Sequence, residues 1–239
     1  MPFTILPQAA QDLFNLSVTP EQVTLFEQYA ELLIHWNKTR ANLTAITEPV
    51  AIEIRHFLDS LSLVLAMELR PGLSVIDVGT GAGFPGLPLK IVYPDLALTL
   101  LEATAKKIAF LEHVSETLGL VGVNYVNLRA EEAGQHAAHR AQYDVVTARA
   151  VAYLPVLAEY LLPLCKVGGR CIAMKGESAA TELEESKNAL RILGGRPTDL
   201  IPVSLPGVAE KHYLIVIEKI AATPRMYPRR PGLPAKKPL

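Results

Sequence analysis

The residues with the most evident chemical potential form a glycine-rich turn directly behind a short apolar run. The segment 75–78 (Val-Ile-Asp-Val) is typical of a buried strand, and glycine follows at alternate positions, Gly79, Gly81 and Gly83. Because glycine lacks a Cβ, the chain there can adopt positive φ and bring backbone N–H groups close to a ligand. The spacing predicts a loop that binds a nucleotide cofactor.

Two kinds of cofactor could use this loop. The residues from Gly81 to Gly86 satisfy the dinucleotide pattern G-x-G-x-x-G, but so short a pattern often occurs by chance. Asp77 followed by three alternate glycines resembles instead the first motif of class I S-adenosylmethionine methyltransferases. A carboxylate suits the ammonium group of that cofactor, whereas a pyrophosphate would favour a position without an acid. We therefore favour S-adenosylmethionine.

Further candidate site residues follow the next strands of the expected sheet. Glu102 comes about twenty residues after the loop, where an acid can accept hydrogen bonds from ribose hydroxyls in either kind of site. Ala130 and Glu131 follow the third strand, where a backbone N–H and a side chain could bracket adenine, although acids are favoured at any helix N-terminus. Arg149 follows the fourth strand, at the edge where ligands bind in open α/β folds, and we expect it in the site.

Short apolar runs alternate with helical patterns from residue 73 onward, which is typical of βαβ units and a parallel sheet. We expect strands at 74–78, 96–101, 123–127, 143–148, 169–174 and 212–218, and a further strand at 200–204 that Pro202 would interrupt. Helices are expected at 87–93, 105–118, 151–164 and 179–193. The sequence thus predicts an α/β fold of the class I S-adenosylmethionine-dependent methyltransferase type, Rossmann-like, with a mostly parallel seven-stranded sheet. This domain uses most of the chain and leaves no second domain for hydride transfer.

Helices precede this domain, and a basic segment follows it. The run 19–22 (Thr-Pro-Glu-Gln) predicts the capped start of a helix that ends near Lys38, and a second helix runs from about Pro49 to Leu65. We divide the chain into an N-terminal helical extension (1–72), a Rossmann-like domain (73–220) and a Pro-rich tail (221–239). From residue 224 the tail has no acid and five cations, which suit RNA phosphates and predict salt-sensitive binding: Arg225, Arg229, Arg230, Lys236 and Lys237.

Composition excludes several classes of protein. The chain has 239 residues, half of them hydrophobic, and a net charge of −1, which favours a folded domain over a disordered one. Cys165 and Cys171 have neither zinc-knuckle nor redox spacing, so no metal site is expected. No window approaches the roughly 18 apolar residues of a membrane helix, and the first residues lack a leader pattern, so we expect a cytoplasmic protein without membrane contact.

The residues after the fourth expected strand bear on which atom receives the methyl group. Enzymes that methylate exocyclic amines commonly have Asn/Asp-Pro-Pro-Tyr/Phe there, whereas residues 149–152 are Arg-Ala-Val-Ala. Methylation at pyrimidine C5 needs a cysteine nucleophile, usually as Pro-Cys, and neither cysteine fits. A ring nitrogen such as guanine N7 attacks the methyl group with its own lone pair, so that orientation suffices and no general base is required. The motifs are compatible with that reaction.

Several separate segments make the chain similar, along nearly its whole length, to the bacterial RsmG (GidB) family of small-subunit ribosomal RNA guanine-N7 methyltransferases. The most specific are the loop extension 83–88 (Gly-Phe-Pro-Gly-Leu-Pro) and the tail, and the segments together are 37–38 with 42–44, 55–56 with 59–60, 77–89, 106–107 with 110–111, 129–131, 149–150, 168–170, 175–176, 227–229 and 232–234. The resemblance implies methylation of N7 of guanine 527 in 16S rRNA, within the small ribosomal subunit or an assembly intermediate.

The same resemblance implies a set of cofactor contacts, which are Gly79, Phe84, Glu102, Ala103, Thr104, Ala130, Glu131 and Arg149. With Asp77 and Gly81 from the loop itself, these are the expected residues of the S-adenosylmethionine site. Many relatives have Asp-Ser where this chain has Glu-Ala-Thr at 102–104. A glutamate can still accept hydrogen bonds from ribose, but its longer reach alters the geometry.

Three basic residues are candidates for contact with the base or phosphate of the RNA. Arg55 and His56 lie on a helix that must end near the loop for the family's site to form, and Lys175 follows the fifth strand. The alternatives are a solvated helix face for the first two and a strand-end charge for the third. A donor to guanine would have to contact O6, because the lone pair of N7 reacts. No residue is assigned as a catalytic acid or base.

Overall fold

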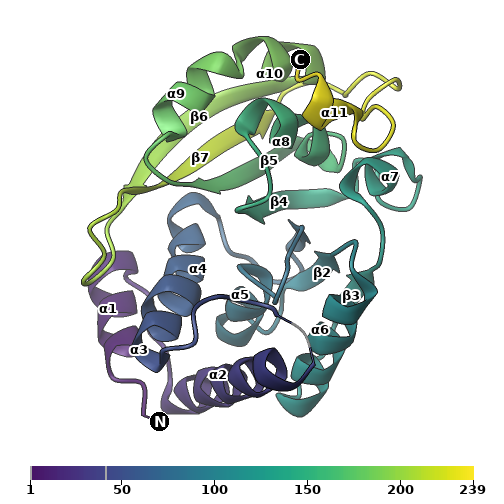
Figure 1. Ribbon diagram of the computed structural model, residues 1–239. Helices are drawn as coiled ribbons and strands as arrows, with labels where there is room; N and C mark the ends of the chain where they lie inside the picture. The colour runs from purple at the N-terminus through teal and green to yellow at the C-terminus, as the bar shows by residue number, and fades with distance from the viewer. Residues whose placement is uncertain (1, 41) are drawn as a thin grey trace.

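The structure is a computed structural model that describes residues 2–40 and 42–239, and in it a seven-stranded sheet forms the centre of the molecule (Figure 1). The strand order is β3-β2-β1-β4-β5-β7-β6; β1 to β5 pair in parallel, and β7 runs antiparallel to β5 and β6. The predicted fold class is confirmed. The strands are β1 Ser74–Val78, β2 Ala97–Leu101, β3 Val123–Val126, β4 Tyr143–Arg149, β5 Cys165–Lys175, β6 Gly195–Val203 and β7 His212–Lys219.

Helices cover both faces of the sheet, because successive strand side chains point to opposite faces and most are apolar. Val75 and Leu98 pack into one hydrophobic cluster with the N-terminal helices, α5 and α6. Ile76 and Val146 pack into a second cluster with α8 and α10. The helices that follow β1 are α5 Gly86–Val92, α6 Ala105–Thr117, α7 Ala130–Gln135, α8 Leu154–Leu161, α9 Ala179–Glu185, α10 Lys187–Leu193 and α11 Leu233–Lys236.

The N-terminal helices contain the predicted capping box and an unexpected change of winding. Thr19 and Gln22 exchange hydrogen bonds at the start of α2 (Pro20–Thr39), as the sequence predicts. The predicted second helix is present, but its middle is a π-helix, a rare form that often marks functional sites. Its parts are α3 Pro49–Ile52, the π-helix η1 Glu53–Leu58, α4 Asp59–Leu61 and the 3₁₀-helix η2 Ser62–Ala66.

Helix α1 (Ile5–Phe14) lies against η1 and is joined to it by a buried acid. The Oε1 atom of Glu53 accepts hydrogen bonds from the backbone N–H groups of Ile5 and Leu6, both at 2.7 Å. These N–H groups have no partner within the helix, and a negative charge is favoured at a helix N-terminus. Glu53 therefore fixes α1 and η1 relative to each other.

Three predicted elements differ from the structure. β6 continues through Pro202, which pairs with Tyr213, because β6 is an edge strand and a proline can face outward there. The helix predicted at 151–164 is the shorter α8, which has Pro155 in its first turn. The helix predicted at 179–193 is divided at Ser186 into α9 and α10.

The tail packs against α7 and α8 instead of extending into solvent (Figure 1). Arg229 forms an ion pair with the fully buried Glu159: its backbone N donates to Oε1 at 2.7 Å and its Nη2 to Oε2 at 2.6 Å. Arg140 holds the same segment by donating to the carbonyl of Tyr227 at 2.7 Å. Arg229 is thus half-buried with its charge paired inside the protein, and its contact with RNA stays a prediction. The other four cations of the tail are exposed, namely Arg225, Arg230, Lys236 and Lys237.

Two further observations concern residues 2–40 and 42–239 as a whole. None of the helices in this part of the chain is both long and apolar enough to cross a membrane. The same residues contain no group of three or more His, Cys, Asp or Glu side chains that could hold a metal ion. Cys165 and Cys171 are buried as free thiols.

We expect Arg229→Ala to destabilise the fold by about 3 to 5 kcal/mol, because it leaves the Glu159 carboxylate buried without its partner. The matched control is Arg230→Ala at the exposed neighbouring position, which should change the free energy of unfolding by less than about 0.5 kcal/mol. Urea denaturation followed by circular dichroism measures both variants. Equal midpoints would contradict a stabilising role for the Arg229–Glu159 pair.

Candidate cofactor and substrate site

The Asp77 carboxylate holds the glycine loop at the end of β1. Its Oδ2 atom accepts hydrogen bonds from Thr80 Oγ1 at 2.6 Å and from Gly86 N at 2.8 Å. The side chain is completely buried, and its Oδ1 atom has no hydrogen-bond partner among residues 2–40 and 42–239. Burial raises the pKa of Asp77 to about 6, against the opposing effect of the two hydrogen bonds. A buried, unpartnered acceptor beside the loop fits the ammonium of a methionyl group.

The backbone of the loop leaves open space where a ligand can approach. Gly79 and Gly81 have φ angles of +66° and +61°. A Cβ added to Gly79 would lie 2.8 Å from the side chain of Val151. A Cβ added to Gly81 would have no atom nearer than 3.9 Å, so the space beside Gly81 is open. The hydroxyl of Tyr29, on α2, donates to the carbonyl of Ala82 and fixes the loop from the side of the N-terminal helices. The loop is therefore rigid, with its open side at Gly81.

Glu102 at the end of β2 faces this loop. Its Oε2 atom accepts from Gly81 N at 3.1 Å, and its Oε1 atom accepts from Thr104 N at 2.9 Å. A cavity of about 170 Å³, which we call the first cavity, lies beside it. The structure brings five of the expected cofactor-binding residues together on this cavity: Gly79, Glu102, Ala103, Ala130 and Glu131. These residues fit the adenosine part of S-adenosylmethionine, because a carboxylate after β2 can accept hydrogen bonds from ribose.

Arg149 connects the end of β4 to the N-terminal helices. Its Nη1 donates to Asp59 Oδ2 at 2.8 Å and to the carbonyl of Arg55 at 3.1 Å, and its guanidinium lies 5.0 Å from the centre of the Phe84 ring. The Oδ1 atom of Asp59 lies 3.0 Å from His212 Nδ1. Burial acts to raise the pKa of Asp59, but hydrogen bonds from His212 and Arg149 outweigh it and hold the pKa below its ordinary value. Asp59 is thus an ionised carboxylate between two basic groups.

His56 is buried beneath Arg149, which excludes the solvated-face alternative for this residue. Its ring stacks on Phe84 with centroids 4.5 Å apart, and its Nε2 lies 2.8 Å from Thr44 Oγ1. Burial, and after it the positive charge of Arg149, lower the pKa of His56 to about 4. At neutral pH the residue is therefore an uncharged ring that packs against the glycine loop.

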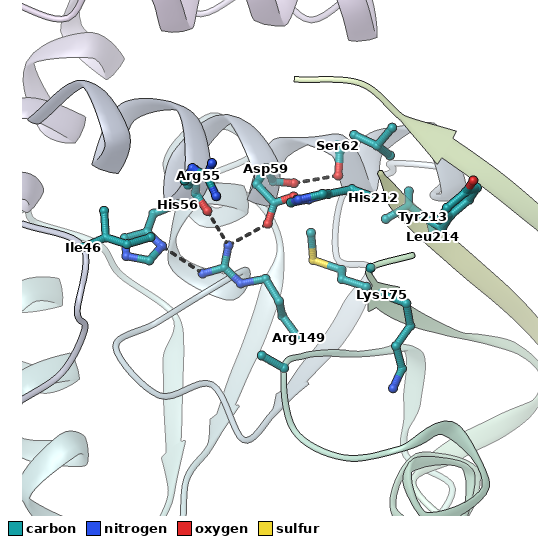
Figure 2. Close-up of a pocket in the computed structure, with 14 residues that line it drawn as sticks. Ile46, Arg55, His56, Asp59, Ser62, Arg149, Lys175, His212, Tyr213 and Leu214 are labelled. Atoms are coloured by element: carbon teal, nitrogen blue, oxygen red, sulfur yellow. Dashed lines mark hydrogen bonds and ion pairs between the residues drawn. The ribbon is translucent and has the colours of Figure 1, made fainter. Parts of the chain in front are cut away.

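A second cavity, of about 400 Å³, lies against this cluster (Figure 2). Arg55 is half-buried and pairs with Glu210 at 3.2 Å. Lys175 pairs with Glu182 at 2.6 Å, and Figure 2 shows its ammonium group directed away from Arg149 and Asp59. All three candidate RNA contacts line this cavity, whose polar lining includes Arg55, His56, Asp59, Arg149, Lys175 and His212.

The two cavities are neighbours at the end of β4. Arg149 and Ala150 line the second cavity, and the next residue, Val151, lines the first. Ala150 has a φ of +55°, which is uncommon for a residue with a Cβ, and the backbone turns there. A cofactor site and a substrate site side by side are what direct group transfer requires.

Three residues of this arrangement were not assigned a role from the sequence: Thr44, Asp59 and His212. Asp59 comes four residues after Arg55, and residues four apart are neighbours on the surface of a helix. This spacing was the one sequence signal that could have linked Asp59 to the candidate residue Arg55. His212 lies 153 residues from Asp59 and has no sequence signal that pairs the two. Thr44 likewise meets His56 only because the segment before α3 folds back onto η1.

The sheet order and the first cavity together place the chain among the class I S-adenosylmethionine-dependent methyltransferases. The family model described as rRNA small subunit methyltransferase G (GidB) matches residues 22–208. The chain is 48% identical to Ribosomal RNA small subunit methyltransferase G of Alkaliphilus metalliredigens over 98% of each chain, and 50% identical to that of Roseiflexus sp. over 95% of each. It therefore belongs to the rRNA small subunit methyltransferase G family.

Solved structures share the fold at low sequence identity. TrmN from Thermus thermophilus matches with a TM-score of 0.53 and 21% identity, over 68% of this chain and 48% of that chain. A SAM dependent methyltransferase from Aquifex aeolicus matches with a TM-score of 0.53 and 17% identity, over 71% and 93% of the two chains. At these identities the likeness concerns the fold alone.

We expect the affinity for S-adenosylhomocysteine to rise by up to about tenfold between about pH 5 and 7. Asp77 has a pKa of about 6, so it is neutral below this range and can attract the ligand's ammonium above it. Asp77→Asn, which cannot ionise, should bind more weakly at neutral pH and lose the rise. Isothermal titration calorimetry measures the affinity of the unchanged protein and of the variant at each pH. If the affinity of the variant still rises with pH, a group other than Asp77 titrates in this range.

Proposed function

We propose that this chain transfers the methyl group of S-adenosylmethionine to N7 of a guanine in 16S rRNA. Membership of the rRNA small subunit methyltransferase G family over nearly the whole chain is the observation that carries the proposal. The second cavity supports it, because a single base turned out of its RNA can enter there and meet the cofactor across residues 149–151. Guanine 527 is the position that the resemblance to the family implies.

Direct attack by N7 suits the groups around the two cavities. N7 carries a lone pair and no proton, so the transfer needs alignment and no proton removal. S-adenosylmethionine supplies an electrophilic methyl group when bound. The chain's own part is orientation: Asp77 holds the methionyl end, Glu102 the ribose, and the stacked Phe84 and His56 rings form a rigid surface beneath Arg149.

Two donors on the second cavity are suited to guanine O6. Arg55 lines that cavity, and a hydrogen bond to Asp59 raises the pKa of His212, which extends the pH range of its protonated form. In the protonated ring Nδ1 donates to Asp59, and Nε2 also carries a proton that it can donate to a base. A donor to O6 leaves the N7 lone pair free to react. Lys175 is held by Glu182 and by the carbonyl of Ala152, so we assign it a structural role.

The exposed cations of the tail supply contacts to RNA phosphates: Arg225, Arg230, Lys236 and Lys237. The net charge of −1 gives little general attraction to RNA, so we propose that the substrate is a folded target in the small ribosomal subunit or an assembly intermediate. Such a substrate places the reaction in the cytoplasm.

The test is methyl transfer from labelled S-adenosylmethionine to small ribosomal subunits from a strain that lacks the endogenous activity, followed by nucleoside analysis. We expect label as 7-methylguanosine at a single site. His212→Asn loses the proposed O6 donor, about 1 to 3 kcal/mol, and should slow the transfer by about fivefold or more. S-adenosylhomocysteine binding should be unchanged in that variant. Binding of S-adenosylhomocysteine without any transfer to subunits would contradict the proposed substrate.

Replacing Arg225 and Arg230 together by neutral residues should make the plot of log affinity for RNA against log salt concentration less steep by about 1.5. Each phosphate contact contributes about 0.7 to 0.9 to the steepness of that plot. Fluorescence anisotropy with a labelled fragment of 16S rRNA measures the slope. The matched control is Lys187→Gln, which removes an exposed cation on α10 that pairs with Glu184. The same slope in the double variant and the control would assign the phosphate contacts to other residues.

A further inference from the structure

The tail reaches the wall of the first cavity. The backbone N–H of Gly232 donates to Oε1 of Glu131 at 2.9 Å. Glu131 is only 5% exposed and lines the first cavity together with Glu102. A segment from the far end of the sequence thus contacts a residue expected at the adenosine part of the cofactor.

Glu131 is also oriented from a second side, by Tyr160 of α8. Burial, followed by the charge of Glu131 and a hydrogen bond to it, raises the pKa of Tyr160 to about 12. The phenol therefore keeps its proton at neutral pH beside the carboxylate. Tyr160 lines the first cavity as well. Glu131 thus lies between Tyr160 of α8 and the backbone N–H of Gly232 in the tail.

The contacts before Gly232 determine where its N–H lies. Arg229 pairs with the buried Glu159, one residue before Tyr160 on α8. The amide of Gln135 donates to the carbonyl of Pro228 at 2.7 Å. Pro228 itself packs on Gly134, where a Cβ would lie 2.7 Å from its ring. These contacts join the tail to both helices that carry Glu131 and Tyr160, so the tail backbone has one position relative to the cavity.

We propose that residues 227–234 are part of the cofactor site and that Gly232 is a positioning residue, which fixes the Glu131 carboxylate for the adenosine part of S-adenosylmethionine. A carboxylate with a fixed orientation is a better acceptor for an exocyclic amine or a ribose hydroxyl than one that has to be ordered on binding. Binding of the cofactor and docking of the tail then strengthen each other, since coupling between two sites is reciprocal. The inference rests on the proposed cofactor role of Glu131.

The test is a double-mutant cycle on affinity for S-adenosylhomocysteine, measured by calorimetry. A variant that ends at Arg230 keeps the Arg229–Glu159 pair and loses Gly232, and a control that ends at Lys236 keeps both. We expect the first truncation to weaken binding about tenfold and the control to bind like the full chain. In the Glu131→Ala background the first truncation should have no further effect, because the side chain that the tail orients is gone.

Equal losses in both backgrounds, or no loss with Glu131 present, would overturn the proposal. Thermal unfolding of the four proteins shows whether the truncated chain is folded. If it is not, hydrogen exchange on the full chain decides: exchange at the Gly232 amide should slow when S-adenosylhomocysteine is added, and unchanged exchange would refute the coupling. A full-length chain without affinity for S-adenosylhomocysteine would overturn the cofactor assignment as well, which separates the two failures.

Discussion

The placement of the Arg149 guanidinium is the constraint on which the rest of the site depends. Its side chain is 16% exposed, and it shares the still more buried Asp59 with His212. A buried charge is costly alone and is tolerated only with its partners in place. η1, the end of β4 and the start of β7 therefore meet in one arrangement. That arrangement packs His56 and Phe84 beneath the guanidinium and leaves the second cavity beside it.

Segments on either side of the central α/β domain complete its two cavities. The domain supplies the glycine loop and Glu102 beside the first cavity, and Arg149 and His212 on the second. The N-terminal helices add Arg55, His56 and Asp59 to the second cavity, and the tail contacts Glu131 on the wall of the first. The match to the family model ends at residue 208, before the tail. The common fold thus lines most of both cavities, and the N-terminal helices complete the second.

The sequence predicts those parts of the site that depend on near neighbours in the chain. The glycine loop and Glu102 follow strands with recognisable patterns, and the capping box of α2 needs only four residues. The ion pairs Asp59–His212 and Arg229–Glu159 span 153 and 70 residues, and charge alone does not reveal whether an arginine meets a carboxylate or a phosphate. The effect of Pro202 could not be predicted from its own strand either. A proline is tolerated in β6 because the strand order places β6 at the edge of the sheet.

The π-helical winding of η1 makes the length of this segment, as well as its residues, a condition for the site. Arg55, His56 and Asp59 owe their relative directions to a turn that is wider than that of an α-helix. A π-helix takes about one more residue for its turn than an α-helix does, because its hydrogen bonds join residues i and i+5. Loss of a single residue from 53–58 would therefore allow a regular α-helix in which α3 and α4 keep nearly their present directions. Asp59 would still meet Arg149 and His212, whereas the side chains inside the wide turn, among them Arg55 and His56, would turn away from their present positions. A one-residue deletion here would thus displace two residues of the second cavity and spare the ion pairs beside them.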